Sequence, residues 1–215
     1  ITIEDPVEYQ IEGITQIQVN PEIGLTFAAG LRSLLRQSPD TIMIGEIRDN
    51  ETLDIAIKAS LTGQMVFSTL HTNDAASSIT RIVDMGIEPF LIASSLIMVC
   101  AQRLCRRICN YCKEEEKVSK DLLRRLGIDE NIKFYRGKGC NNCNNTGFHG
   151  RMGILEVLMI DETIREMIIN NATSDDIKNY ATRQMGMKTL RDDALLKVRE
   201  GITSLDEALR ITAEE

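Results

Sequence analysis

The sequence predicts an α/β protein: a parallel sheet with flanking helices, followed by an inserted cysteine-rich subdomain and a helical C-terminal region. Short apolar runs alternate with helix-length amphipathic stretches over residues 1–102, which is typical of parallel βαβ units. Two Cys-x-x-Cys pairs fall within residues 103–151, and residues 152–215 read as one strand followed by helices. We therefore expect three parts with these boundaries.

Four strands are expected in the first part. The compact apolar runs Ile1–Ile3, Thr41–Ile44 and Met65–Leu70 suit buried strands. Ile14–Val19 alternates apolar with polar residues, as an edge strand or a hairpin arm does. Because βαβ crossovers are right-handed, helices should cover both faces of the sheet.

The expected helices begin at residues that can cap them. Thr26 and Asn50 each precede an amphipathic stretch, and Asn73 precedes another that runs to about Met85. A last apolar helix of this part is expected to end near Cys100. The later elements expected from the pattern are a short helix at Asp121–Leu126, a strand at Gly153–Ile160, and helices whose capping-box-like starts are Thr173 with Asp176 and Ser204 with Glu207.

Composition limits the classes of function. The chain is 43% hydrophobic but only 4% aromatic, so its core must be built from aliphatic residues and methionine. Its net charge of -7 argues against a protein that wraps nucleic acid with its whole surface. Residues 103–151 hold 12 lysines and arginines against 6 acids, a local charge of +6, which leaves -13 on the rest. This basic excess is either a solvated face or a docking surface.

The compartment is predicted to be the cytosol. No apolar run reaches the roughly 18 residues that a membrane span needs. The chain opens on Ile1 without a secretory signal, so its six cysteines suggest metal ligands or free thiols rather than disulfides.

Reactive side chains stand where three predicted strands end. Glu4 and Asp5 follow the first strand, Glu46 follows the second and His71 follows the third. Ligands of such sheets bind beyond the carboxyl ends of the strands, where two carboxylates and an imidazole suit Mg²⁺, an attacking water and a phosphate. Taken singly, each residue also fits an ordinary turn, a loop or a structural histidine.

These segments resemble the secretion ATPases that drive type II secretion and type IV pilus assembly. Ile1–Glu8, ITIEDPVE, is similar to their aspartate box; Leu31–Asp49, LRSLLRQSPDTIMIGEIRD, to their arginine-bearing helix and Walker B segment; Thr62–Asp74, TGQMVFSTLHTND, to their histidine box. The cysteine pairs and the ending Gly201–Ile211 also fit, so the resemblance covers essentially the whole chain.

The resemblance implies a RecA-like P-loop ATPase core that assembles into a homo-hexameric ring. It assigns water activation to Glu4, organisation of Mg²⁺ to Glu46 as the Walker B acid, and contact with the γ-phosphate to His71. It further implies a set of residues for nucleotide or subunit-interface contacts: Asp5, Arg32, Arg36, Arg48 and Arg81.

Two departures from the family pattern matter. The Walker A loop, Gly-x-x-x-x-Gly-Lys-Ser/Thr, which lies upstream of the aspartate box in this family, is not in the sequence. We therefore expect this chain alone to bind ATP poorly and to hydrolyse little of it. Gln64 stands where the family usually has a second histidine.

The cysteine pairs predict a zinc site. Cys109, Cys112, Cys140 and Cys143 form two CxxC turns, which together make a closed tetrahedral Cys₄ site of structural type. A redox dithiol is the alternative. We expect Cys100 and Cys105 to be buried apolar residues, and His149 to be at most a substitute ligand.

The partners implied by the resemblance are the inner-membrane platform proteins of a secretion or pilus machine, with the protein peripheral to the bacterial inner membrane. The basic residues of the insertion could also bind anionic lipid headgroups: Arg103, Arg106, Arg107, Arg124, Arg125, Arg136 and Lys138. A zinc-ribbon module that reads nucleic acid and a purely structural interaction domain are the alternatives. A module that reads nucleic acid would need more stacking aromatic residues than this region has, so no specific nucleic acid is expected as a partner.

Overall fold

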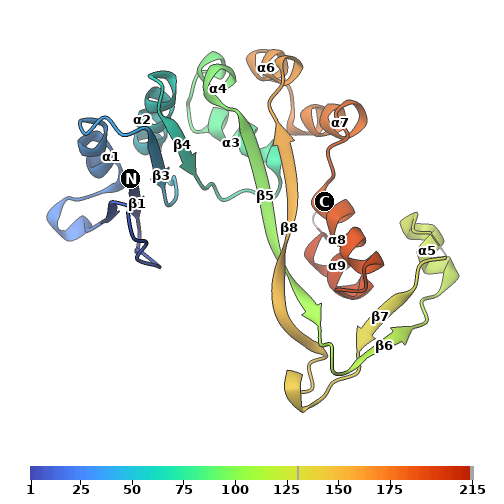
Figure 1. Ribbon diagram of the computed structural model, residues 1–215. Helices are drawn as coiled ribbons and strands as arrows, with labels where there is room; N and C mark the ends of the chain where they lie inside the picture. The colour runs from blue at the N-terminus through green and yellow to red at the C-terminus, as the bar shows by residue number, and fades with distance from the viewer. Residues whose placement is uncertain (130, 214–215) are drawn as a thin grey trace. The chain divides into compact units, whose positions relative to one another are not determined.

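The computed structural model describes residues 1–129 and 131–213, which divide into two compact units. The first unit comprises residues 1–72, 76–99 and 159–178. The second comprises residues 73–75, residues 100–158 and the chain from residue 179 onward. Figure 1 shows the elements of each unit along the chain.

The first unit contains a four-stranded sheet. Its strands are β1 (Thr2–Glu4), β2 (Gln16–Gln18), β3 (Thr41–Ile44) and β4 (Met65–Ser68), in the order β2-β1-β3-β4. All neighbouring pairs are parallel, which confirms the predicted sheet. β2 lies at one edge of the sheet and is parallel to β1, so the edge-strand interpretation is right and the hairpin interpretation is wrong.

Five helices are wholly or largely in the first unit: α1 (Phe27–Leu35), α2 (Asn50–Leu61), α3 (Ala75–Asp84), α4 (Pro89–Ser95) and α6 (Glu162–Ile169). The side chain of Thr26 accepts from the amide of Ala29 at 3.2 Å, as expected of the cap of α1. The cap of α2 is Asp49, not Asn50, because the Asp49 carboxylate accepts from the amide of Thr52 at 2.7 Å.

The prediction of a helix reaching Cys100 is wrong. α4 ends at Ser95, and β5 (Met98–Ile108) follows it and pairs with β8 (Phe148–Met159). The two strands form a long ribbon and run in opposite directions (Figure 1). Through Cys105 exposed positions of β5 alternate with more buried ones, a period that fits a strand better than a helix.

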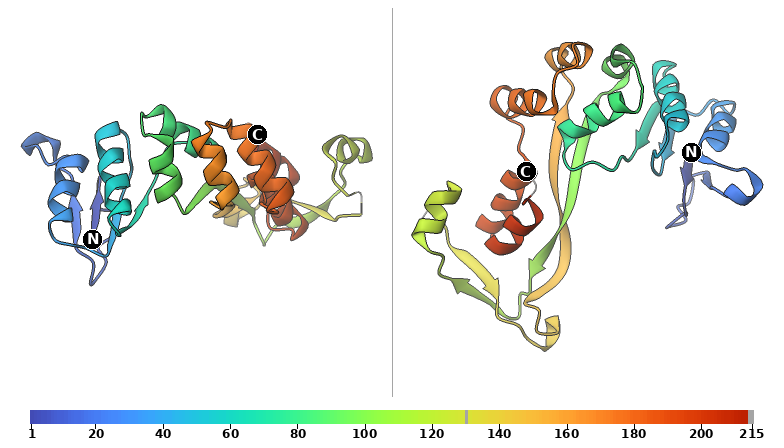
Figure 2. Two further views of the ribbon diagram at one scale, coloured as in Figure 1. Left: turned by 90° about the horizontal axis from the view of Figure 1, so that it is seen from above. Right: turned by 180° about the vertical axis from the view of Figure 1, so that it is seen from behind.

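Among the described residues, the second unit consists of two ribbons, three whole helices and part of a fourth helix. Besides β5 and β8 it has β6 (Lys113–Glu116) paired antiparallel with β7 (Phe134–Gly137), and the helices α5 (Lys120–Leu126), α8 (Leu190–Arg199) and α9 (Leu205–Ile211). The helices α8 and α9 lie side by side in both views of Figure 2. Its core combines residues from all of these elements except β6, among them Cys105, Leu123, Phe134, Ile154, Leu190 and Leu205.

The helical tail divides between the two units. α6 belongs to the first unit, α7 (Ser174–Gln184) spans residues of both, and α8 and α9 belong to the second. The predicted strand of the tail is the end of β8, which starts within the cysteine-rich insertion. The division into three parts by motif, at residues 1–102, 103–151 and 152–215, stays a prediction.

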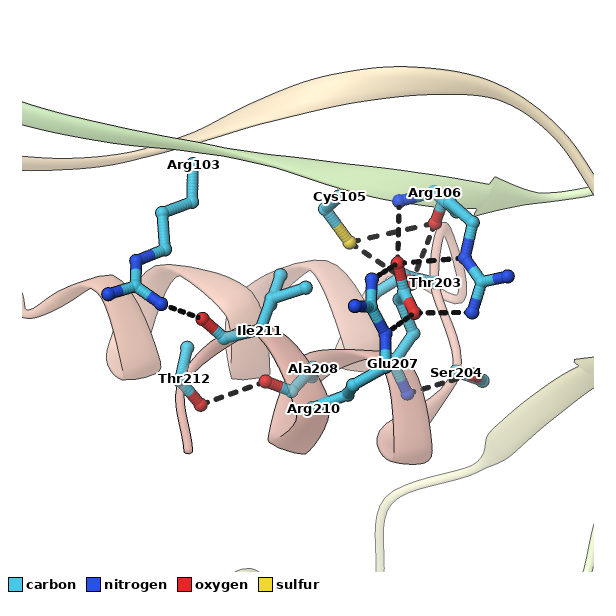
Figure 3. A network of polar contacts seen from close by, with 10 residues as sticks. All are labelled: Arg103, Cys105, Arg106, Thr203, Ser204, Glu207, Ala208, Arg210, Ile211 and Thr212. Carbon is cyan, nitrogen blue, oxygen red and sulfur yellow. Dashed lines mark hydrogen bonds and ion pairs between the residues drawn. The ribbon is translucent and has the colours of Figure 1, made fainter. Parts of the chain in front are cut away.

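A buried carboxylate attaches α9 to β5. Glu207 is 1% exposed and accepts hydrogen bonds from the amide, Nε and a terminal nitrogen of Arg106, and from two nitrogens of Arg210, at 2.7–3.1 Å (Figure 3). Burial alone would raise the pKa of Glu207, but the bonds from Arg210 and Arg106 lower it to about 2. Glu207 therefore remains ionised inside the protein at neutral pH.

Replacing Glu207 with glutamine is expected to destabilise the second unit in a pH-dependent way. Because folding lowers this pKa from 4.5 to about 2, the ionised carboxylate stabilises the fold above pH 4.5. That stability, roughly 3 kcal/mol, is lost as the pH falls towards 2. Urea unfolding of wild type and Glu207→Gln at about pH 7 and about pH 3 measures the difference in their free energies of unfolding. This difference should be smaller at about pH 3. A pH-independent difference would contradict this account.

Candidate functional site

The carboxyl ends of β1, β3 and β4 meet at one edge of the sheet, as predicted. β3 lies between the other two strands, and the amide of Gly45 donates to the carbonyl of Ile3 at 2.8 Å. A Cβ atom on Gly45 would lie 3.4 Å from the Cα of Glu4, which is ordinary contact distance and shows that the two strand ends are adjacent. The segments that bear Glu4, Glu46 and His71 are therefore neighbours.

Glu46 is the centre of the contacts at this edge. Its Oε2 atom accepts from Nε of Arg48 at 2.7 Å and lies 3.1 Å from Nε2 of His71, which donates when it carries the proton there. The hydrogen bond from Arg48, and then the one from His71, lower the pKa of Glu46, against a smaller opposing effect of burial. The carboxylate is thus ionised at neutral pH and carries an acceptor oxygen, Oε1, besides the paired one.

Two hydrogen bonds between neighbouring segments bring His71 to Glu46. The amide of Ile47 donates to the carbonyl of Thr69 at 3.0 Å, and the Thr69 hydroxyl donates to the carbonyl of Gly45 at 2.7 Å. These two bonds join the segment after β3 to the segment after β4. His71 itself is 82% exposed, whereas Glu46 is 15% exposed, so the imidazole covers the acid from the solvent side. Sequence reasoning missed Thr69, for which the only signal is a hydroxyl close to a strand end.

Glu4 is oriented by its own strand and by the edge strand. Its Oε1 atom accepts from the hydroxyl of Thr2 at 2.5 Å and from the side-chain amide of Gln16 at 3.0 Å. Oε2 has no hydrogen-bond partner within residues 1–129 and 131–213, so it can bind water. Asp5 is exposed and attracts Arg48, which raises the pKa of that arginine less than Glu46 does.

A cavity of 210 Å³ opens beside His71. Three nitrogen-bearing side chains line it, those of Arg48, His71 and Arg81, together with Ile47, Leu70 and Met85. Two guanidinium groups and an imidazole at the surface of one cavity suit an anion with several oxygens, such as a phosphate group. Of the predicted arginines, Arg48 and Arg81 are therefore brought to the strand ends.

Arg32 and Arg36 are not brought there. Arg32, on α1, is ion-paired with Glu51 of α2, and Arg36 donates to the hydroxyl of Ser33 at 3.1 Å. Arg32 also lines a separate open cavity of 490 Å³ between α1 and α2, which includes Gln64. Gln64 accepts from the hydroxyl of Thr62 at 2.8 Å, so its side chain is held at that cavity.

The second unit carries a site that could hold a metal ion. The sulfur atoms of Cys109, Cys112, Cys140 and Cys143 all lie within 4.8 Å of one another. The shortest separations are 3.7 Å and 3.8 Å, close to the spacing of about 3.8 Å that a tetrahedral ion at 2.3 Å from each sulfur requires. No described sulfur pair is a disulfide.

The loops around the cysteines favour a thiolate at Cys143. Backbone amides of Cys140 and Gly147 donate to the sulfur of Cys143 at 3.2 Å and 3.3 Å. Burial would raise the pKa of Cys143, but these bonds lower it to about 6. Burial and the neighbouring thiols raise the pKa of Cys112 to about 12, since a second negative charge is harder to add. Gly137 and Gly147 are needed here because a side chain on Gly137 would begin 1.9 Å from the Gly147 carbonyl oxygen.

The remaining predicted thiols and imidazole lie outside this cluster. Cys105 is fully buried, as predicted, and its sulfur lies 3.2 Å from the hydroxyl of Thr203. Cys100 is exposed on β5, so its predicted burial is wrong; the strand turns this residue outward. His149 is exposed and is not among the clustered ligands.

Much of the predicted basic surface is paired within the protein. Arg106 binds Glu207, Arg136 binds Glu114 at 2.9 Å, and Arg103 donates to the carbonyl of Ile211 at 2.9 Å. Arg124 also has a partner. Of the predicted basic residues, the three whose side chains have no partner among the described contacts are Arg107, Arg125 and Lys138.

Comparison with known proteins identifies the family. The family model described as "Type II/IV secretion system protein" matches residues 1–210. This chain belongs to that family. Its relatives include the type IV pilus assembly ATPase PilB of Thermus thermophilus, 54% identical over 99% of this chain and 24% of its own length. The type II secretion system protein E of Pseudomonas aeruginosa is 48% identical over 100% of this chain and 43% of its own length.

Solved structures agree on the fold. The pilus retraction motor PilT with bound ADP has a TM-score of 0.69 and 28% identity, over 98% of this chain and 51% of its own. The Legionella pneumophila ATPase DotB has a TM-score of 0.68 and 25% identity, over 100% and 51% of the two chains. The core is therefore RecA-like, and this chain spans about half of these structures and less than half of the curated relatives. No helix in the described residues is long and apolar enough to cross a membrane.

Proposed function

We propose that this chain is the C-terminal catalytic part of a hexameric motor ATPase that powers type II protein secretion or type IV pilus assembly. The observation that carries the proposal is the contact of Glu46 with Arg48 and His71 at the carboxyl ends of parallel strands. Relatives named as a type IV pilus assembly ATPase and a type II secretion system ATPase support the same reaction for the whole protein.

The site residues take the following roles in this proposal. Glu46 holds Mg²⁺ directly or through water, because it stays ionised and keeps an oxygen outside its ion pair. Glu4 orients the attacking water with its unpaired oxygen. His71 contacts the terminal phosphate, and Arg48 and Arg81 neutralise charge in the cavity that they share with it. Asp5, Arg32 and Arg36 are left for subunit contacts.

The cysteine cluster is proposed to hold zinc. Four sulfur ligands at tetrahedral spacing leave no open coordination position, so the ion would stabilise the fold and not take part in hydrolysis. The second unit needs such support because its turns around Cys140 are rich in polar residues and glycine.

ATP hydrolysis by the full-length protein tests the function. With Mg²⁺ and zinc present, the full-length protein should turn over ATP, while this chain alone should not, since its sequence has no Walker A loop. A full-length protein that binds no nucleotide would contradict the proposal. Binding without turnover would indicate that a membrane partner is needed for activity.

The partner surface is proposed to include Arg107 and Arg125, which face the platform proteins of the inner membrane or anionic lipid headgroups. Both are exposed and lack a partner among the described contacts. We expect Arg107→Glu with Arg125→Glu to weaken binding to vesicles containing anionic lipid by at least about 30-fold, because each basic residue contributes about 1 kcal/mol at such a surface. Cosedimentation with anionic and neutral vesicles measures this.

A matched control separates docking from folding. Arg136→Gln with Glu114→Gln removes a basic residue together with the acid that it pairs with, so the net charge is unchanged and vesicle binding should change little. Equal binding by wild type and the variant with both Arg107→Glu and Arg125→Glu, both to vesicles and to platform protein, would exclude this surface.

A further inference from the structure

A second buried acid, Glu156, stands apart from the proposed catalytic residues. It lies on β8 in phase with Ile154 and Leu158, and all three side chains are 0% exposed. A carboxylate in a row of core positions is rare unless it is fully paired. Its partners therefore indicate why it is there.

Each carboxylate oxygen of Glu156 binds the first residue of a different helix. Oε1 accepts from the amide of Ala75 at 2.8 Å, and Oε2 accepts from the amide of Leu190 at 3.3 Å. These are the first residues of α3 and α8. A carboxylate at a helix start accepts from an amide that has no partner within the helix. Its negative charge also interacts favourably with the positive end of the helix dipole. One side chain thus fixes the starting points of two helices.

A short series of contacts leads from Ala75 to the proposed site. Ser78, one turn into α3, is buried, and its hydroxyl lies 2.6 Å from that of Thr72. Thr72 follows His71, whose Nε2 atom lies 3.1 Å from Glu46. The start of α3 therefore holds the residue next to the imidazole, and Glu156 holds the start of α3.

We propose that Glu156 is a positioning residue for His71: by fixing the amide of Ala75, it sets where the segment 71–75 ends and so where the imidazole meets Glu46. This role rests on the proposed ATPase function. The hydrogen bonds described for Glu156 go to Ala75 and Leu190 and not to Glu46 or His71, so it acts through α3 and not on the reacting atoms.

Glu156→Gln in the full-length protein tests the role. Glutamine keeps one acceptor oxygen but turns an NH₂ group towards one of the two amides. Hydrogen exchange of a peptide covering residues 70–76 should become faster. Turnover at saturating ATP should fall about tenfold while KM changes less than about twofold, because misplacement of a catalytic group affects mainly the transition state.

A double-mutant cycle separates positioning from general damage. In a His71→Ala background, Glu156→Gln should lower turnover by less than about twofold, since a residue that acts through His71 has nothing left to position. Asp193→Asn is the matched control: Asp193 accepts from the amide of Leu155 at 3.0 Å, so it attaches α8 to β8 without touching α3. It should leave both the exchange of residues 70–76 and the turnover near wild type.

The outcomes distinguish the two proposals. Unchanged exchange at residues 70–76, or full additivity with His71→Ala, overturns the role of Glu156. A wild-type protein that neither binds nor hydrolyses ATP contradicts the proposed function instead, while the exchange data still show whether Glu156 holds the segment. If Glu156→Gln fails to fold, Ser78→Ala removes the contact with Thr72 and should show the same non-additivity; additivity there overturns the proposal.

Discussion

Full-length protein carrying Glu46→Gln is expected to bind ATP but to hydrolyse it at least about 100-fold more slowly than wild type. Glutamine has nearly the shape of glutamate, so the backbone at the end of β3 should be unchanged. The charge that attracts Mg²⁺ and pairs with Arg48 and His71 is lost. Phosphoryl transfer depends mainly on positioning and on neutralisation of charge, both of which are removed here.

Steady-state ATP hydrolysis and a fluorescent-nucleotide binding assay measure this result together. Glu51→Gln is the matched control, because Glu51 belongs to the same unit and is also paired with an arginine, Arg32, which lines the other cavity and not the one beside His71. It should retain turnover within about twofold of wild type. Equal turnover by wild type and Glu46→Gln would mean that Glu46 is only a structural partner of Arg48.

The pH dependence of ATP turnover above pH 4.5 should not come from Glu46. Arg48, and then His71, hold the pKa of this carboxyl below its ordinary value of 4.5. Its charge, and the stability that the ion pair contributes, are therefore complete above that value and are lost only as the pH falls further. A loss of turnover well above pH 4.5 would have to come from another group.

The sequence predicted the parts of the fold that depend on local pattern. The strands ending at Glu4, Ile44 and Ser68, and the helix capped by Thr26, are set by short apolar runs and capping side chains. The strand ends lie within two residues of the predicted ones: β1 ends one residue later than expected and β4 two residues earlier. The strand β5 was mistaken for helix because Met98–Cys100 continues an apolar run, and its pairing with the distant β8 cannot be read from neighbouring residues.

The candidate site was predictable in its members but not in its contacts. Strand ends identify Glu46 and His71, but the sequence does not show that Arg48 turns back to pair with Glu46, or that Arg32 pairs with Glu51 instead. Long side chains choose partners by tertiary geometry. Glu156 could have been found, because a lone acid alternates with Ile154 and Leu158 in a predicted strand. The two helix starts that it binds are far away in sequence, at Ala75 and Leu190.

Cys143→Ser is expected to unfold the cysteine loops and to destabilise the second unit more than any other substitution considered above. Cys143 is 5% exposed and accepts two backbone amide bonds while contributing one of four clustered sulfurs. Serine is a poor zinc ligand, and structural zinc contributes on the order of 10 kcal/mol to folding. The loops cannot compensate, because Gly137 and Gly147 are already in close contact and the segment buries few apolar side chains.

Bound metal and unfolding should change together in this experiment. Elemental analysis should give about one zinc per wild-type chain and much less in Cys143→Ser, and chelator treatment of wild type should reproduce the lowered melting temperature. Cys100→Ser is the control, since Cys100 is exposed on β5 and lies outside the cluster; it should keep its zinc and its stability. Wild-type protein without zinc that melts at the same temperature with and without chelator would show that the four thiols fold the loops by themselves. In that case the amide-to-sulfur bonds around Cys143, and not an ion, would be what holds the two CxxC turns together.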